Sequence, residues 1–157
     1  DKLCEFFRYS LDNNAKNKTN LSKELQLLDL YLSIEKVRFA DRLSINTQIS
    51  DDVLQCEIPS MLLQPLVENS IKYAIEPRKE GGNITLTAVK QGDRLILRVL
   101  DNGDGQHDVV SDGFGIGMSN TKARLDAMFN GDYNINIANN DQKGTSVSIS
   151  VPFEKLS

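Results

Sequence analysis

The segment 59–75 carries polar side chains whose types suit phosphate and metal chemistry. A helix turns by about 100° per residue, so Glu68, Asn69 and Lys72 share one half of its wheel. Tyr73 lies at the border of that half, and the opposite half is apolar. An amide oxygen can ligate Mg²⁺, an ammonium can neutralise phosphate charge, and a carboxylate can accept a proton or orient water. The alternative is a solvated helix face with an ordinary i,i+4 pair between Glu68 and Lys72.

A second motif, DNGDG at 101–105, directly follows an alternating apolar strand. Its first carboxylate, Asp101, is compatible with an ordinary turn. The same carboxylate could instead accept a hydrogen bond from the exocyclic amine of a purine base. In that case Gly103 and Gly105 would let the ring lie against bare backbone.

A third motif, GFGIGMSN at 113–120, runs into a predicted helix at about 119–129. The backbone N–H groups of a glycine loop and of a following helix start attract phosphate. The spacing is not the GxGxxG of a dinucleotide-binding Rossmann fold, and the absence of GxxxxGK[ST] excludes a P-loop. The alternative for this motif is a glycine-rich linker.

The remaining elements predict an α+β fold in which helices cover one face of a mixed, mostly antiparallel sheet. Residues 1–16 have the apolar spacing of a helix end, and Ser22 is the predicted N-cap of the next helix. Pro59 is expected to open a helix that Pro65 either kinks or breaks. The predicted helices span 22–42, 59–75 and 119–129, and the predicted strands span 43–49, 56–58, 84–89, 95–100, 133–137 and 147–151.

Composition excludes several classes of function. The 157 residues have a formal net charge of −4 and lack a Lys/Arg cluster, which argues against nucleic acid as the main partner. No apolar run approaches the roughly 20 residues of a membrane helix. Cys4 and Cys56 lie outside any CxxC motif, so neither a zinc site nor a disulfide framework is expected, and a reducing cytoplasmic setting is the default.

In combination, the three motifs and the pair Gly144-Thr145 at the opening of the last strand resemble the ATP-binding fold shared by gyrase-type ATPases, Hsp90, MutL and histidine kinases, the GHKL ATPase superfamily. The sequence LQPLVENSIKY at 63–73 resembles the N box of LytS-type sensor histidine kinases. The segments YLSIE at 31–35, RF at 38–39, DRL at 41–43 and FRYSL at 7–11 are also similar to that family. The resemblance implies a two-layer α/β sandwich over residues 21–157. Residues 1–20 would be the tail of a dimerisation and phosphoacceptor helical region.

The resemblance also assigns roles to the residues of the N box. Asn69 would ligate Mg²⁺, Glu68 would assist proton transfer, Lys72 would contact phosphate, and Tyr73 would lie beside the nucleotide. Tyr73 is itself a departure, because these kinases often have His at that position.

The other two motifs would complete the ATP site. Asp101 would recognise the adenine amino group with support from Thr145, and Gly103 and Gly105 would lie against the ring. Asp104 departs from the family pattern by adding a negative charge. The resemblance assigns the lid hinge and further phosphate contacts to Gly113, Gly115, Gly117 and Asn120.

The function implied is that of the ATP-binding catalytic domain of a two-component sensor histidine kinase. The γ-phosphoryl would pass from Mg²⁺-bound ATP to an upstream His and then to a response regulator, possibly of the LytTR type. The only His here is His107, in the expected lid, so the acceptor is expected on a helix of the same or a partner subunit. The full-length protein is expected to be a homodimeric, membrane-anchored sensor whose cytoplasmic part includes this domain, without direct contact to nucleic acid.

Three other functions remain open at this point. A stand-alone ATPase of the gyrase or MutL kind would use Glu68 to activate water. An anti-sigma-type serine kinase would share the fold, although the segment 31–43 argues against it. A degenerate, non-catalytic module would use the fold for protein contacts only.

Overall fold

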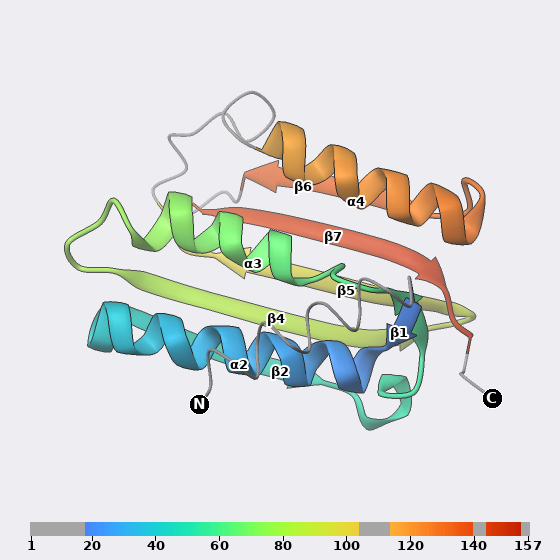
Figure 1. The fold of residues 1–157 in the computed structure, drawn as a ribbon, viewed down its shortest axis with the longest axis horizontal. Coiled ribbons are helices and arrows are strands. Elements are labelled where there is room, and N and C mark those ends of the chain that lie inside the picture. Colours follow the sequence, from blue (N-terminus) through green and yellow to red (C-terminus); the bar gives the residue numbers. More distant parts are fainter. Residues whose placement is uncertain (1–17, 104–113, 140–143, 155–157) are drawn as a thin grey trace.

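A five-stranded mixed sheet forms the centre of the fold, and the helices lie on one of its faces (Figure 1). The bounds of these helices are Leu21–Phe39 for α2, Gln64–Ser70 for α3 and Phe114–Phe129 for α4. The predicted α+β class, with helices on one face of a mixed sheet, is confirmed.

The computed structural model describes residues 18–103, 114–139 and 144–154, with the backbone alone for 114–118. The predicted helix end at 1–16 lies outside the described residues. The same is true of Gly105, His107 and Gly113.

The strand order in the main sheet is β2-β4-β5-β7-β6. Strand β2 pairs with β4 in parallel, and the other neighbours are antiparallel. A separate two-stranded antiparallel ribbon joins β1 to β3. The bounds of the strands are Lys18–Asn20 for β1, Leu43–Ile49 for β2, Glu57–Pro59 for β3, Gly82–Gln91 for β4, Arg94–Asp101 for β5, Asn134–Asn139 for β6 and Thr145–Pro152 for β7.

Alternation along the central strands separates a buried face from a polar one. Leu86, Val99 and Val147 are neighbours in register across β4, β5 and β7, and each is almost fully buried beneath the helices. The opposite face carries half-buried or exposed polar side chains, and the Arg98 Nε–H donates to Ser148 Oγ across it at 3.1 Å. Because side chains alternate with a period of two, Asp101 points to the same face as Val99, toward the helices.

Helix α2 begins earlier than the sequence predicts. Its N-cap is Asn20, whose side chain accepts the Lys23 N–H at 2.8 Å, so the predicted cap at Ser22 is wrong. Asn20 is also the last residue of β1, and its Nδ2–H donates to Gln55 Oε1 at 3.2 Å. A 3-10 turn, Ala40–Arg42, follows the helix directly and brings the chain to β2.

The second predicted helix starts later than expected, at Gln64, because Pro59 is the last residue of β3. Pro65 occupies the first turn of α3, where a missing N–H leaves no hydrogen bond unmade. Of the two outcomes predicted for Pro65, it therefore marks a helix boundary and not a kink. After Ser70 the helix widens into a π-helical turn, η3 (Ile71–Ile75), in which the Glu76 N–H donates to the Ile71 carbonyl at 2.9 Å.

Helix α4 also begins before its predicted start at residue 119. Its first turns include the backbone of Gly115 and Gly117, which were expected to lie in a loop. Glycine disfavours a helix interior by about 1 kcal/mol relative to alanine, and tertiary context overrides a preference of that size. Leu125 of this helix is completely buried.

Candidate functional site

Several elements that carry the predicted site residues meet at one end of the molecule. Strand β5 ends there at Asp101, β7 begins there at Thr145, and the end of α3 and the start of α4 lie nearby (left in Figure 1). The antiparallel register pairs Asp101 directly with Thr145, so the two predicted residues are neighbours.

The carboxylate of Asp101 is held by backbone donors on two sides. Its Oδ1 accepts the Gly103 N–H at 3.0 Å and the Thr145 N–H at 3.2 Å. Thr145 itself is buried, with 8% of its surface exposed. Two directional hydrogen bonds to one oxygen fix the orientation of the carboxyl group relative to the sheet edge.

Gly144 is a structural requirement of this arrangement, and its close contact with Asp101 was not predicted from the sequence. Its φ of +111° is rarely adopted by residues with a side chain, and a Cβ there would lie 2.2 Å from the carbonyl oxygen of Asp101. At this point the backbones of β5 and β7 lie so close together that only glycine fits at position 144. The Gly-Thr pair is visible in the sequence as a strand opening, but its contact with Asp101 depends on a pairing of strands distant in sequence.

Gly103 joins the Asp101 motif to the predicted N box. A Cβ at Gly103 would lie 3.0 Å from the Cβ of Ala74 and 3.1 Å from Asp101 Oδ1. Ala74 belongs to η3 and directly follows Tyr73. The structure thus places the loop after β5 against the end of the helix that carries Glu68, Asn69 and Lys72.

The N-box side chains project from α3 and η3 with different exposure. Glu68 and Lys72 are exposed, and Asn69 and Tyr73 are half-buried. The Gln64 Nε2–H donates to Glu68 Oε1 at 3.0 Å, and Lys72 Nζ lies 5.3 Å from the centroid of the Tyr73 ring. The i,i+4 ion pair considered from the sequence does not form between Glu68 and Lys72, because the helix widens to a π turn between them.

The predicted site residues therefore fall into three groups. The first is Asp101, Gly103 and Thr145, which direct hydrogen bonds unite. The second lies on the adjoining helix and includes Asn69 and Lys72. The third lies on α4, where Asn120 is exposed and Gly115 and Gly117 contribute backbone to the first turns.

The donor set fits a magnesium ion that the nucleotide itself helps to hold. Within the described ranges, no group of three or more His, Cys, Asp or Glu side chains could bind a metal ion unaided. Mg²⁺ is commonly bound through one or two protein oxygens while phosphate and water oxygens complete its shell. The amide oxygen of Asn69 is a hard, neutral ligand of that kind.

Two side chains of α2, Tyr31 and Glu35, lie close enough to Glu68 to sense its charge. Burial raises the pKa of Tyr31, and the negative charges of Glu35 and Glu68 add to this rise. Burial also raises the pKa of Glu35, while Arg38 opposes the rise. Arg38 bridges this group to Glu76, with its Nη2 2.8 Å from the Glu76 carboxylate. Two residues of the YLSIE segment therefore share the electrostatic environment of the N box.

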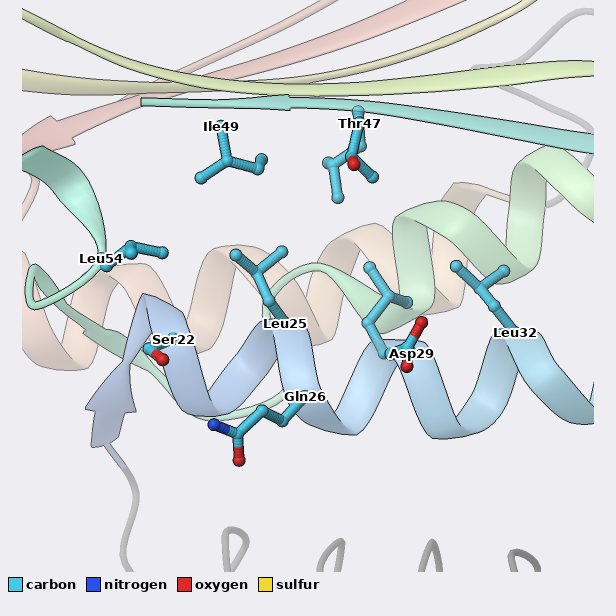
Figure 2. A pocket seen from close by; sticks show the side chains of 10 residues that line it. Ser22, Leu25, Gln26, Asp29, Leu32, Thr47, Ile49 and Leu54 are labelled. Atoms are coloured by element: carbon cyan, nitrogen blue, oxygen red, sulfur yellow. The ribbon is translucent and has the colours of Figure 1, made fainter. Parts of the chain in front are cut away.

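A separate cavity of about 370 Å³ lies between α2 and the sheet (Figure 2). Among the described residues that line it, Asp29 alone is ionisable, and its negative charge would repel phosphate. The same lining residues include neither a glycine nor a positively charged side chain. This cavity is therefore distinct from the site at Asp101. Its lining residues are Ser22, Leu25, Gln26, Leu28, Asp29, Leu32, Thr47, Ile49, Leu54 and Leu86.

Comparison with known families identifies the class of protein that this fold and site define. Residues 58–155 match the family described as histidine kinase-, DNA gyrase B- and HSP90-like ATPases, and the chain belongs to that family. Residues 1–43 match a histidine kinase family.

Sensor histidine kinases are among the most similar relatives. The chain is 33% identical to the sensor histidine kinase BtsS of Escherichia coli over 151 residues, which cover 96% of this chain and 27% of BtsS. It is 35% identical to the sensor protein LytS of Staphylococcus epidermidis over 164 aligned residues, which cover 98% of this chain and 28% of LytS. The chain thus spans less than a third of the length of these relatives.

Solved histidine kinase structures share the fold. The histidine kinase domain of the Erythrobacter litoralis blue-light activated histidine kinase aligns with a TM-score of 0.67 at 16% identity, covering 98% of this chain and 75% of that one. The nucleotide-free catalytic domain of histidine kinase ThkA aligns with a TM-score of 0.65 at 14% identity, covering 87% and 94%. Within the described residues, no helix has the length and apolar character needed to cross a membrane.

Proposed function

We propose that this chain is the ATP-binding catalytic domain of a sensor histidine kinase. It would transfer the γ-phosphoryl group of ATP to a histidine on an upstream helix, from which a response regulator receives it. The observation that carries the proposal is the carboxylate of Asp101, which two backbone N–H groups orient at a sheet edge beside the N-box helix.

Recognition of the base would rest on Asp101. A carboxylate is an acceptor only, so it favours the exocyclic amine of adenine over a ring that presents a carbonyl at the same place. The N–H groups of Gly103 and Thr145 fix the carboxylate in place, and the bare backbone of Gly103 and Gly105 would leave room for the ring. Tyr73 would lie beside the nucleotide.

The triphosphate would be held from the helices. Asn69 would hold Mg²⁺, which supplies charge neutralisation to the phosphates when bound. Lys72 is exposed on the same segment and would add a positive charge, while Glu68 would assist proton transfer. Backbone N–H groups at Gly113, Gly115 and Gly117 and the side chain of Asn120 would contact the phosphates near the start of α4.

Phosphoryl transfer in this arrangement would consist mainly of positioning and charge neutralisation. The attacking nucleophile would be the imidazole of the acceptor, so the domain does not need a strong base of its own. Residues 1–20 would be the tail of the dimerisation and phosphoacceptor region, and residues 21–157 would be the catalytic domain. We further propose a homodimeric full-length protein, membrane-anchored with this domain in the cytoplasm, and a response regulator of the LytTR type.

The test is Mg²⁺-dependent binding of a fluorescent ATP analogue to the wild-type chain and to Asp101→Asn and Asn69→Ala. Asparagine keeps an oxygen for the two backbone donors but presents an amino group in place of the second oxygen. A hydrogen bond to a charged group contributes about 1.5–3 kcal/mol, so we expect D101N to weaken binding by roughly ten- to a hundredfold. We expect N69A to remove most of the Mg²⁺ dependence.

Matched controls are Asp93→Asn, in the exposed turn between β4 and β5, and Asn136→Ala, on the exposed side of β6. Both should bind like the wild-type chain. Equal binding by D101N, N69A and their controls would contradict the proposal. ATP turnover by this domain alone that Glu68→Gln abolishes would instead favour a stand-alone ATPase, and a lack of any adenine nucleotide binding would favour a non-catalytic module.

A further inference from the structure

A buried carboxylate on α2 has no part in the proposed chemistry. Glu24 has 1% of its surface exposed. Its Oε1 accepts the Met61 N–H at 3.2 Å, and its Oε2 accepts the Leu63 N–H at 3.0 Å. Burial raises the pKa of the Glu24 carboxyl, and these backbone hydrogen bonds and the nearby Arg124 guanidinium oppose that rise. A buried acid is unfavourable unless it is hydrogen-bonded, and here both of its oxygens are.

The backbone that Glu24 holds is the turn that leads into α3. Met61 has a φ of +60° in this turn, a conformation that residues with side chains rarely adopt. From the other side, Arg124 of α4 donates a hydrogen bond to the Ser60 carbonyl. The turn is therefore held between α2 and α4 in a geometry that its own sequence does not favour.

The opposite end of the same segment is held by Arg42, which follows α2 in the 3-10 turn. Its Nη2 donates to the carbonyls of Ile75 at 3.1 Å, Glu76 at 3.2 Å and Arg78 at 2.7 Å. The backbone around Arg42 is also tightly packed, because a Cβ at Gly81 would lie 1.9 Å from the Arg42 carbonyl oxygen.

The hydrogen-bonding types of these two groups suit their places. The acceptor oxygens of Glu24 lie where N–H groups point outward at the start of the segment, and the donors of Arg42 lie where carbonyls point outward at its end. Glu24 belongs to α2 and Arg42 to the turn directly after it, so a single stretch of chain holds both ends of residues 64–75.

We propose that Glu24 and Arg42 are positioning residues that fix the segment 64–75 from both ends and thereby place Asn69 and Lys72 relative to Asp101. This inference rests on the proposed nucleotide site. A displacement of α2 would move the N box with it and would change the affinity for Mg²⁺-ATP, although neither residue touches the nucleotide.

The test compares Glu24→Gln and Arg42→Gln with two kinds of control. Asp29→Asn removes the same charge from an exposed position on α2. Leu95→Ala removes a fully buried side chain from the start of β5, far along the strand from Asp101, and lowers stability without touching the segment. The measurements are the affinity for a fluorescent ATP analogue with Mg²⁺, at a temperature where all variants are folded, and amide hydrogen exchange by peptide.

We expect E24Q and R42Q each to weaken nucleotide binding by about fivefold or more, equivalent to about 1 kcal/mol, and to accelerate exchange in 61–78. D29N and L95A should keep the wild-type affinity. Because L95A lowers stability without touching the segment 64–75, it shows whether lower stability alone weakens nucleotide binding. Affinities of E24Q and R42Q equal to those of D29N, in a wild-type chain that binds nucleotide, would overturn this inference alone. Failure of the wild-type chain to bind would overturn the proposed function and, with it, the inference.

Discussion

The close approach of β7 to β5 at Gly144 makes Gly144→Ala a sharp test of how the Asp101 carboxylate is held. The new Cβ would lie 2.2 Å from the Asp101 carbonyl oxygen, and real Cβ contacts essentially never fall below 3.0 Å. One of the two strand ends must therefore move. The Thr145 N–H to Asp101 Oδ1 hydrogen bond, at 3.2 Å, lies beside this contact and would be stretched or broken by the movement.

Two effects of this substitution have different magnitudes and different readouts. A side chain at a φ of +111° destabilises the fold by about 1–3 kcal/mol, whatever surrounds it. A hydrogen bond to a carboxylate contributes about 1.5–3 kcal/mol. If its loss frees the carboxylate at the proposed base-recognition site, nucleotide affinity should fall by roughly ten- to a hundredfold.

The matched control is Gly131→Ala, because Gly131 also has a positive φ, +90°, but a Cβ there would enter open space, with no contact within 4 Å beyond its chain neighbours. Thermal unfolding should report a loss of stability for both variants. A titration with the fluorescent ATP analogue should show weakened binding for G144A and wild-type binding for G131A. If G144A binds nucleotide as well as G131A does, the contact with Asp101 does not support the base site, and the reasoning is refuted.

Two further predictions concern stability. Burial raises the folded-state pKa of Glu24 above its ordinary 4.5. The excess unfolding free energy of the wild-type chain over E24Q should therefore be largest below about pH 4.5 and should decline as pH rises through the folded-state pKa. Urea unfolding at a series of pH values measures this, and a constant difference would contradict it. Leu95→Ala should lower the unfolding free energy by about 2–5 kcal/mol in the same assay, because it leaves a cavity in the core; a loss below about 1 kcal/mol would contradict its full burial.

The strands of the five-stranded sheet and its hairpin were predictable because alternation depends on local sequence alone. Strand β1 was not predicted, because it pairs with the distant β3. The start of α3 was missed for the same reason. Pro59 ends β3 by pairing with Lys18, a residue far away in the sequence, and so the helix cannot begin until after the turn at 60–63. Gly115 and Gly117 disfavour a helix locally, yet the backbone of both lies in the first turns of α4.

The residues of the candidate site also include some that the sequence predicts and some that it does not. Asp101, Gly103 and Thr145 were predictable because their motifs are recognisable, and the structure brings them into direct contact. The roles of Glu24 and Arg42 were not predictable. From the sequence, Glu24 is an ordinary acid in the first turn of a helix, and Arg42 belongs to a segment similar to the family without an assigned role. Only the tertiary structure reveals that their partners are backbone groups at the two ends of the N-box segment.

The short ribbon of β1 and β3 has a mechanical consequence. Strand β1 continues without a break into α2, and β3 leads into the turn before α3, while Thr19 and Ile58 pair between them. A force applied at Lys18 would therefore act on two helices through one three-residue ladder. Such a force would shift α2 and α3 together.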